Sequence, residues 1–301
     1  MTTAAALIAK AATQLMLAGL ETPQREARLL LAHVLEVEAA ELALIPDRPV
    51  GPQEAARFAE AVERRAGHEP FAYITGRRDF WTLELEVSPA TLIPRPDTET
   101  LVETALKIVG HVRAPVRILD LGTGTGAILL ALLTELPRAE GVGVDVSDEA
   151  LEIARRNALR AGAGDRARFS KSSWWSDVTG EFDLIVSNPP YIPSREIVEL
   201  DADVRDFEPR LALDGGPDGL AAYRAILSVA GQRLSENGAV LFEVGAGQAG
   251  DVAAMMRASG LPYTATRRDL GGHERVVAGA AGPQVLVDIA DFPVGRRTET
   301  D

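Results

Sequence analysis

Cysteine is absent from the 301-residue chain, which excludes disulfide bonds and thiolate-bound metals. The four histidines (His33, His68, His111 and His273) are too scattered for a ligand set, so we expect no metal site. No apolar run approaches the roughly 20 residues of a membrane span, and the start of the chain lacks a signal pattern, so we expect a cytoplasmic protein without a membrane partner. Basic residues are outnumbered by acidic ones, 31 to 44. The formal net charge of -13 opposes binding to polyanions, so we expect no direct nucleic-acid binding.

The chain does have material for a core, since 46% of its residues are hydrophobic, and we expect two domains. Apolar residues at helical spacing predict a small helical domain over residues 1–75, to which we assign partner recognition. Its first helix would bury a stripe that includes Leu17. A helix that opens at Pro52 would turn Ala59 inward and the pair Arg64-Arg65 outward.

Residues 76–96 are expected to form a β-hairpin linker, because apolar and polar residues alternate from Trp81 to Val87. A helix follows and runs to about Val109. Arg95 and Glu99 flank its start. They could form an ion pair at the helix N-terminus or belong to a functional site, and the sequence leaves both possibilities open.

Strands and helices alternate over residues 97–280, which predicts an α/β domain with a doubly wound, Rossmann-like sheet. The pattern places a helix over residues 220–234 and gives Asp148 the role of a helix cap. Residues 281–301 are expected to form a loosely attached C-terminal tail.

A glycine-rich loop follows the first strand of this domain. Its glycines let the backbone approach a ligand closely, and the helix that follows offers unpaired N–H groups to an anion. About 20 residues later a second strand ends at Asp145, whose carboxylate suits the ribose hydroxyls of a nucleoside. The loop alone also fits the loose dinucleotide-binding pattern, so a nicotinamide enzyme is a competing interpretation. The loop comprises Gly122, Thr123, Gly124, Thr125 and Gly126, directly after Asp120 and Leu121.

The stretch 182–191 joins a buried strand to a loop whose chemistry can be interpreted. Two prolines, Pro189 and Pro190, forbid continuation of the apolar strand, which must stop at Asn188. The Asn188 side-chain oxygen and the Pro189 carbonyl remain as acceptors and can receive an NH2 group. Tyr191 adds a flat face that can pack against a planar, conjugated group.

The tetrapeptide Asn188-Pro189-Pro190-Tyr191 resembles the motif of methyltransferases that modify an sp2 nitrogen. Asp120 and the glycine loop resemble the first motif of class I methyltransferases. With residues 71–76, 93–99, 208–220 and 268–275, these motifs are similar to the protein-(glutamine-N5) methyltransferases that act on peptide chain release factors. The similarity covers most of the chain, from about residue 28 to residue 278.

This resemblance implies a class I methyltransferase sheet and S-adenosylmethionine as the methyl donor. It also implies class I peptide chain release factors as protein substrates, methylated on the side-chain N5 of glutamine in a Gly-Gly-Gln motif. The donor would be bound by Gly122, Thr123, Gly124, Thr125, Gly126, Asp145, Trp174 and Asn188. The substrate glutamine would be bound by Asn188, Pro189, Pro190 and Tyr191, and the residues in catalytic roles would be Asn188, Pro189 and Tyr191.

The resemblance is weakest at the residues beside the adenine. Ser173 departs from the family, which often has Asp before the tryptophan, and Trp174 is favoured over its neighbour Trp175 as the residue beside the adenine.

Two alternative functions remain open. An adenine-N6 nucleic-acid methyltransferase would use the same tetrapeptide on a flipped base, although the acidic charge opposes it. A catalytically silent S-adenosylmethionine-binding interaction module is the other alternative.

Overall fold

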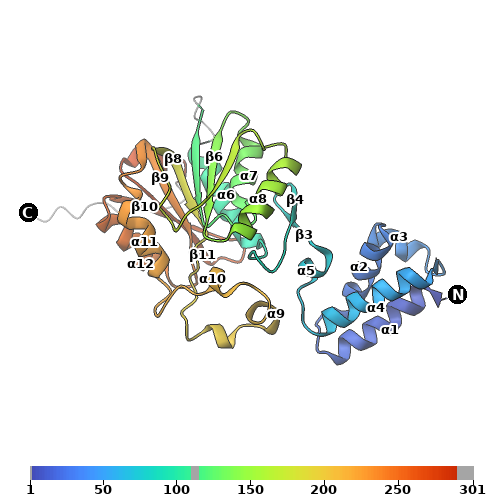
Figure 1. The fold of residues 1–301 in the computed structure, drawn as a ribbon. Helices are drawn as coiled ribbons and strands as arrows, with labels where there is room; N and C mark the ends of the chain where they lie inside the picture. The colour runs from blue at the N-terminus through green and yellow to red at the C-terminus, as the bar shows by residue number, and fades with distance from the viewer. Residues whose placement is uncertain (1, 110–114, 290–301) are drawn as a thin grey trace, which may run out of the picture. The chain divides into compact units, whose positions relative to one another are not determined.

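The computed structural model describes residues 2–109 and 115–289, and the chain separates into two compact units (Figure 1). Unit 1 comprises Met1–Arg77 together with Asp201–Phe207. Unit 2 comprises Arg78–Leu200 together with Glu208–Asp301. No helix within the two described ranges is long and apolar enough to cross a membrane.

Unit 1 is a small helical bundle. Proline opens two of its helices at the first position, where its missing N–H costs no hydrogen bond. Apolar side chains from α1, α2, α4 and α5 form one core. The unit contains α1 (Ala4–Leu17), α2 (Pro23–Leu35), α3 (Ala39–Leu44), α4 (Pro52–Ala66), α5 (Phe71–Thr75), α9 (Ala202–Arg205) and the antiparallel strands β1 (Thr2–Thr3) and β2 (Pro49–Val50).

Three expectations about the faces of these helices are wrong. Leu17 is 80% exposed, because the buried stripe of α1 ends at Leu15 and a residue two positions later lies on the opposite face. Ala59 is also exposed, because it lies outside the face of α4 that Phe58 and Val62 bury. Arg65 is only 8% exposed, since its position shares the buried face of α4, and its guanidinium pairs with Glu26 of α2.

A seven-stranded sheet organises unit 2, in the order β10-β11-β9-β8-β5-β6-β7. Only β11 runs antiparallel to its neighbours, β10 and β9. The other pairings are parallel. The predicted doubly wound α/β sheet is therefore confirmed. Its strands are β5 (Arg117–Leu121), β6 (Glu140–Asp145), β7 (Ala167–Lys171), β8 (Phe182–Ser187), β9 (Leu234–Glu243), β10 (Tyr263–Arg268) and β11 (Glu274–Ala280).

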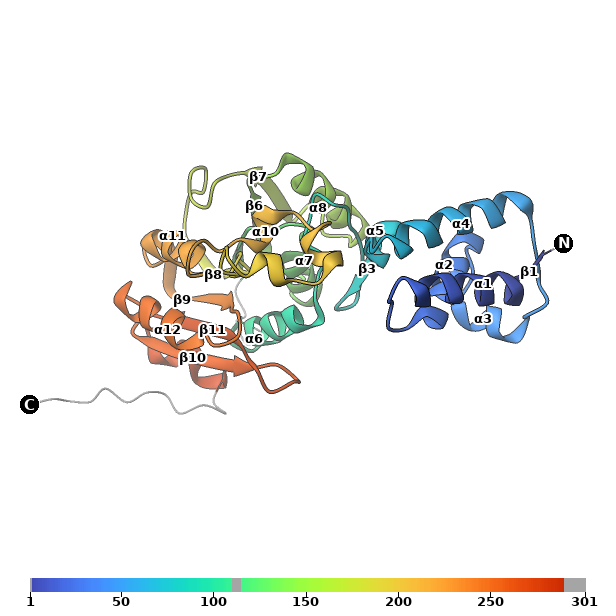
Figure 2. The same ribbon diagram turned by 90° about the horizontal axis from the view of Figure 1, so that it is seen from below.

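Helices cover both faces of this sheet (Figures 1 and 2). On one face α6 (Glu99–Val109), α7 (Ala127–Glu135) and α8 (Asp148–Arg160) pack against side chains such as Ile118 and Leu184. On the other face α11 (Ala221–Ala230) and α12 (Ala249–Ala258) pack against Leu119, Ile185 and their neighbours. Strands β5 and β8 are thus buried on both sides, and their carboxyl ends meet at one edge of the sheet.

Shorter elements precede α6 and follow β8. Strands β3 (Arg77–Phe80) and β4 (Leu83–Glu86) pair in a two-stranded sheet, as the alternating pattern predicts. A 3-10 turn, η1 (Pro96–Thr98), precedes α6, and two further short elements, η2 (Ile197–Glu199) and α10 (Arg210–Leu213), follow β8.

Three boundaries in unit 2 differ from expectation. Leu234 begins β9 instead of ending the preceding helix, which stops at Ala230. Ser147, not Asp148, caps α8, because its hydroxyl accepts the N–H of Ala150 at 3.2 Å. The expected loose tail contains η3 (Pro283–Ile289), whose Leu286 is buried in the core, while residues 290–301 lie outside the described part of the chain.

Candidate active site

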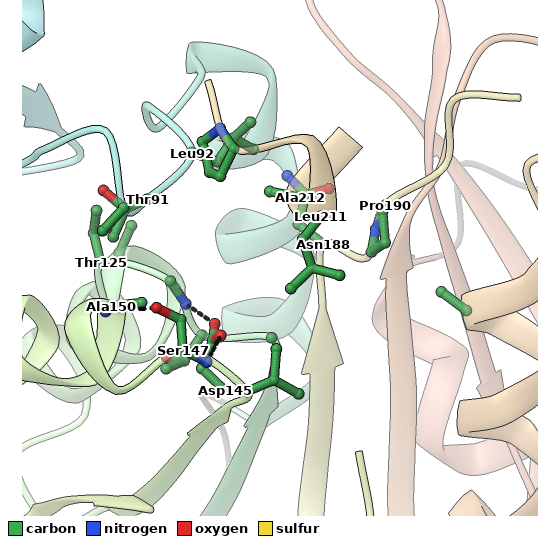
Figure 3. Close-up of a pocket in the computed structure, with 18 of the residues that line it drawn as sticks. Thr91, Leu92, Thr125, Asp145, Ser147, Ala150, Asn188, Pro190, Leu211 and Ala212 are labelled. Carbon is green, nitrogen blue, oxygen red and sulfur yellow. Dashed lines mark hydrogen bonds between the residues drawn. The ribbon is translucent and has the colours of Figure 1, made fainter. Parts of the chain in front are cut away.

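A cavity of about 780 Å³ lies where β5, β6 and β8 end. Open α/β sheets bind ligands at this edge, and the volume is that of a small-molecule site. Figure 3 shows Asp145 and Ser147 in one part of this pocket and Asn188, Pro190, Leu211 and Ala212 in another. Of the predicted site residues, the lining includes Gly122, Thr123, Gly124, Thr125, Asp145, Trp174, Asn188 and Pro190.

The glycine loop is tied to the end of β6 through its backbone. The N–H groups of Gly122 and Thr123 both donate to the carbonyl of Val144, each at 2.9 Å. Gly124 has φ +52°, a left-handed conformation in which a side chain is costly. Gly126, the predicted member that is not in the lining, is the residue before α7. The loop is therefore held in a fixed shape before any ligand arrives.

Asp145 receives two backbone hydrogen bonds. The N–H of Gly124 donates to its Oδ2 at 2.9 Å, and the N–H of Ser147 donates to its Oδ1 at 3.0 Å. A carboxylate has about four acceptor positions, so two remain for a ligand. Asp145 can thus accept a pair of hydroxyl groups without losing the bonds that orient it.

Asp120 lies beneath the loop and is fully buried. Burial raises the pKa of this carboxyl to about 7, and the charge of Asp145 acts in the same direction, against the hydrogen bond that Thr123 donates at 2.7 Å. Its Oδ1 has no hydrogen-bond partner among the residues that the structure describes. Asp120 therefore anchors Thr123 from below the loop.

The two adjacent tryptophans separate at this point. Trp174 has φ +53° and lines the pocket, and its ring comes within 3.7 Å of the position that a Cβ on Gly122 would take. Trp175 is not in the lining, and its indole N–H donates to the carbonyl of Ile226 in α11 at 3.0 Å. Of these two tryptophans, Trp174 is the one that lines the cavity.

Two contacts brace the loop after β8. Gly215 packs against it so closely that a Cβ would lie 2.8 Å from the Pro190 carbonyl oxygen and from the Tyr191 Cα. The side chain of Gln248 donates to the Tyr191 carbonyl at 2.9 Å. Beside this brace, the Asn188 Nδ2 group donates to the Thr98 hydroxyl at 3.3 Å.

Pro189 and Tyr191 are not in the lining of the cavity. Tyr191 is largely buried, and burial, followed by the negative charge of Glu243, raises the pKa of its phenol to about 12. Its hydroxyl thus stays protonated at neutral pH. The ring lies against Gly245, where a Cβ would come within 3.0 Å of its Cδ2.

Arg95 lines the cavity and pairs with Glu208, whose side chain is buried. Glu208 also accepts the N–H of Ile93 at 3.2 Å. The alternative of an ion pair between Arg95 and Glu99 is wrong, because Glu99 instead accepts the backbone N–H of Trp81 at 3.0 Å. The bond to Glu208 holds the segment that leads into α10 beside the pocket.

Comparison with known proteins identifies the family. A family model described as the PrmC N-terminal domain matches residues 6–76, and one described as the Methyltransferase small domain matches residues 98–202. The release factor glutamine methyltransferase of Rhodospirillum rubrum is 45% identical over 95% of this chain and 89% of its own length. That of Agrobacterium fabrum is 47% identical over 92% of this chain and 96% of its own. The chain belongs to the release factor glutamine methyltransferases. The family and the enzyme class predicted from the motifs are confirmed.

Solved structures agree with the fold of a release factor glutamine methyltransferase. The human METTL16 catalytic domain superposes with a TM-score of 0.56 at 16% identity, over 77% of this chain and 82% of that one. A methyltransferase from Pyrococcus furiosus gives 0.50 at 20% identity, over 77% of this chain and 100% of that one. At these identities the likeness concerns the fold alone, and it confirms the predicted methyltransferase sheet.

Sequence reasoning missed several residues of this release factor glutamine methyltransferase site. Leu92, Leu211 and Ala212 line the pocket from loops whose apolar residues carry no local signal. Thr98 and Glu243 lie next to Asn188. Glu243 did carry a signal, since a carboxylate directly after the apolar run Val240–Phe242 is unusual in a buried strand.

Proposed function

We propose that this chain transfers a methyl group from S-adenosylmethionine to the side-chain N5 of the glutamine in the Gly-Gly-Gln motif of class I peptide chain release factors. The names of the curated relatives support the substrate class. The observation that carries the proposal is that Asn188, at the end of β8, lines the same cavity as the glycine loop and Asp145. An amide-binding group and a nucleoside-binding group thereby share one pocket.

The residues present suit S-adenosylmethionine, which supplies a reactive methyl group on a positively charged sulfur. Asp145 keeps two acceptor positions for the ribose hydroxyls, and Trp174 offers a ring face for the adenine. The shaped backbone from Gly122 to Gly126 would accommodate the remainder of the donor. No metal is needed, because the positive sulfur already activates the methyl group.

Asn188 and Pro189 would bind the substrate amide. The Nδ2 group of Asn188 donates to Thr98, which leaves Oδ1 as the acceptor for one N–H of the glutamine. The Pro189 carbonyl would accept the other N–H, and the nitrogen lone pair would then point at the methyl group from about 3 to 3.5 Å. Pro190 stiffens this loop. Tyr191, which lies outside the pocket lining, would act by supporting the loop through its packed ring.

This arrangement stabilises the transition state more than the ground state. Positive charge would develop on the amide nitrogen as its bond to the methyl carbon forms and the carbon–sulfur bond of the donor breaks, which leaves a neutral thioether; two fixed acceptor dipoles would face that charge. The nitrogen becomes acidic only after methylation, so the proton can leave afterwards to water. No strong general base is required.

The variant Asn188→Ala tests this assignment. We expect methyl transfer to a purified release factor to fall by about 10²-fold or more, with donor affinity kept within several-fold, because one charge-stabilising contact is lost. Asn237→Ala, at an exposed position of β9, is the matched control and should transfer methyl at the wild-type rate.

Three outcomes would argue against the proposal. Wild-type turnover by Asn188→Ala would remove Asn188 from the mechanism. Methylation of duplex DNA by the unmodified chain would favour an adenine-N6 methyltransferase. Donor binding without transfer to any substrate would favour a silent binding module.

A further inference from the structure

Glu243 is a buried carboxylate that the mechanism above does not use. It is the last residue of β9 and is only 1% exposed, directly after three fully buried apolar residues. Strands β8 and β9 are parallel, with Ser187 opposite Phe242, so the next residues along each strand are Asn188 and Glu243. The carboxylate thus lies beside the residue that would bind the substrate amide.

Two polar side chains, those of Thr98 and Asn188, lie next to this carboxyl group. Burial raises the pKa of Glu243 to about 7, while these two side chains and the positive charge of Arg275 oppose that rise. The Oε2 atom has no hydrogen-bond partner within residues 2–109 and 115–289. A buried carboxyl with an unsatisfied oxygen is costly, and such a cost calls for a functional reason.

Other charged and titratable groups face the same site from each neighbouring element. Arg275 comes from β11 and is shared with two other carboxylates, Asp97 at 3.1 Å and Asp269 at 3.2 Å. Tyr191 lies on the loop after β8. On α11, the Tyr223 hydroxyl donates to the backbone carbonyl of Glu243 at 2.9 Å, and not to its carboxyl group.

The chemistry of these partners bears on which end of the Asn188 amide faces the substrate. An asparagine side chain can present either its oxygen or its NH2 group, and binding a glutamine N–H requires the oxygen. The Thr98 hydroxyl both donates and accepts, so it is compatible with either orientation. An ionised carboxylate only accepts, so it is compatible only with the NH2 group.

We propose that Glu243 is a positioning residue whose carboxylate holds the Nδ2 group of Asn188 and thereby presents Oδ1 to the substrate glutamine. This inference rests on the proposed function and deepens it. A protonated Glu243 no longer selects this orientation, because a neutral carboxyl can also donate its O–H to Oδ1 and turn the acceptor away from the pocket. Methyl transfer should therefore be faster with the ionised form.

The test measures kcat between about pH 5.5 and 9 with saturating donor and release factor. For the wild type we expect kcat to rise several-fold as the pH increases through the pKa of Glu243 in the complex, from the level of Glu243→Gln to the full rate. Glu243→Gln, which can hold Asn188 in either orientation at any pH, should be several-fold slower and lose this pH dependence. Glu243→Met should lower kcat by about 10²-fold, as expected when the amide is no longer oriented.

Donor affinity should stay within several-fold of wild type in both variants, which separates loss of orientation from loss of folding. Tyr223→Phe is the matched control, because it removes a hydrogen bond to the same residue but leaves the carboxylate, and it should keep the wild-type pH profile. An unchanged pH profile in Glu243→Gln, or a wild-type kcat in a folded Glu243→Met, would overturn the inference alone. Failure of the wild type to methylate the release factor would instead refute the proposed function and the inference with it.

Discussion

The substitution Glu243→Gln should make the free energy of unfolding less dependent on pH. Burial raises the pKa of Glu243 from 4.5 to about 7, so the folded protein binds this proton more tightly than the unfolded chain. The stability that the group contributes is fully present below about pH 4.5 and is lost as the pH rises through about 7. A rise of about 2.5 pH units, at about 1.4 kcal/mol per unit, corresponds to about 3 kcal/mol.

Urea unfolding without ligand measures this contribution. The difference in unfolding free energy between Glu243→Gln and the wild type should grow by about 3 kcal/mol, in favour of the variant, between about pH 4.5 and pH 8.5. Contributions from other titrating groups, such as Asp120, are common to both proteins and cancel in the difference.

A control on the same strand separates burial from the mere loss of a charge. Glu236→Gln changes an exposed carboxylate of β9, and its stability should stay parallel to that of the wild type at every pH. A constant difference between Glu243→Gln and the wild type across this range would refute the reasoning, because it would mean that burial does not penalise the ionised form of Glu243.

Two further changes have effects that the structure specifies. Gly215→Ala should destabilise the protein by about 1 to 3 kcal/mol and slow methyl transfer, because the added Cβ would press on the loop after β8. Gly250→Ala is the control: no atom lies within 4 Å of its added Cβ, so it should be neutral or stabilising by up to about 1 kcal/mol. Equal losses of unfolding free energy in the two variants, measured in denaturant, would contradict the packing argument. Arg65→Met should lower the free energy of unfolding by about 2 kcal/mol, because Glu26 loses its partner. The control Arg64→Met removes an exposed arginine and should lower it by at most about 1 kcal/mol. The reversed order in the same assay would contradict the burial of Arg65.

Local signals predicted most elements of the fold. Pro23 and Pro52 mark the first residues of α2 and α4, because proline suits the first position of a helix. Pro189 and Pro190 predicted the end of β8 to within one residue, since the strand was expected to stop at Asn188 and ends at Ser187. Alternation of strands and helices predicted the sheet, since a parallel arrangement requires a crossover between successive strands.

Features that depend on distant residues were not predictable from such signals. Arg95 pairs with Glu208, 113 positions away, rather than with a charge four positions along the chain. The burial of Arg65 depends on Glu26 of another helix. Glu243 acquires its neighbour only because β9 pairs with β8, a consequence of sheet order that no local pattern encodes.

Mass spectrometry of a class I release factor incubated with S-adenosylmethionine and the wild-type chain shows directly whether the glutamine side chain is the methyl acceptor. One methyl group should be added to the glutamine of the Gly-Gly-Gln motif, and none to a factor in which that glutamine is replaced by glutamate. A site built from two acceptors should reject glutamate by about 10⁴-fold, because its oxygens would face those acceptors without hydrogen atoms. Methylation at another residue, or equal methylation of the glutamate form, would contradict the assignment of Asn188 and Pro189 as amide-binding acceptors.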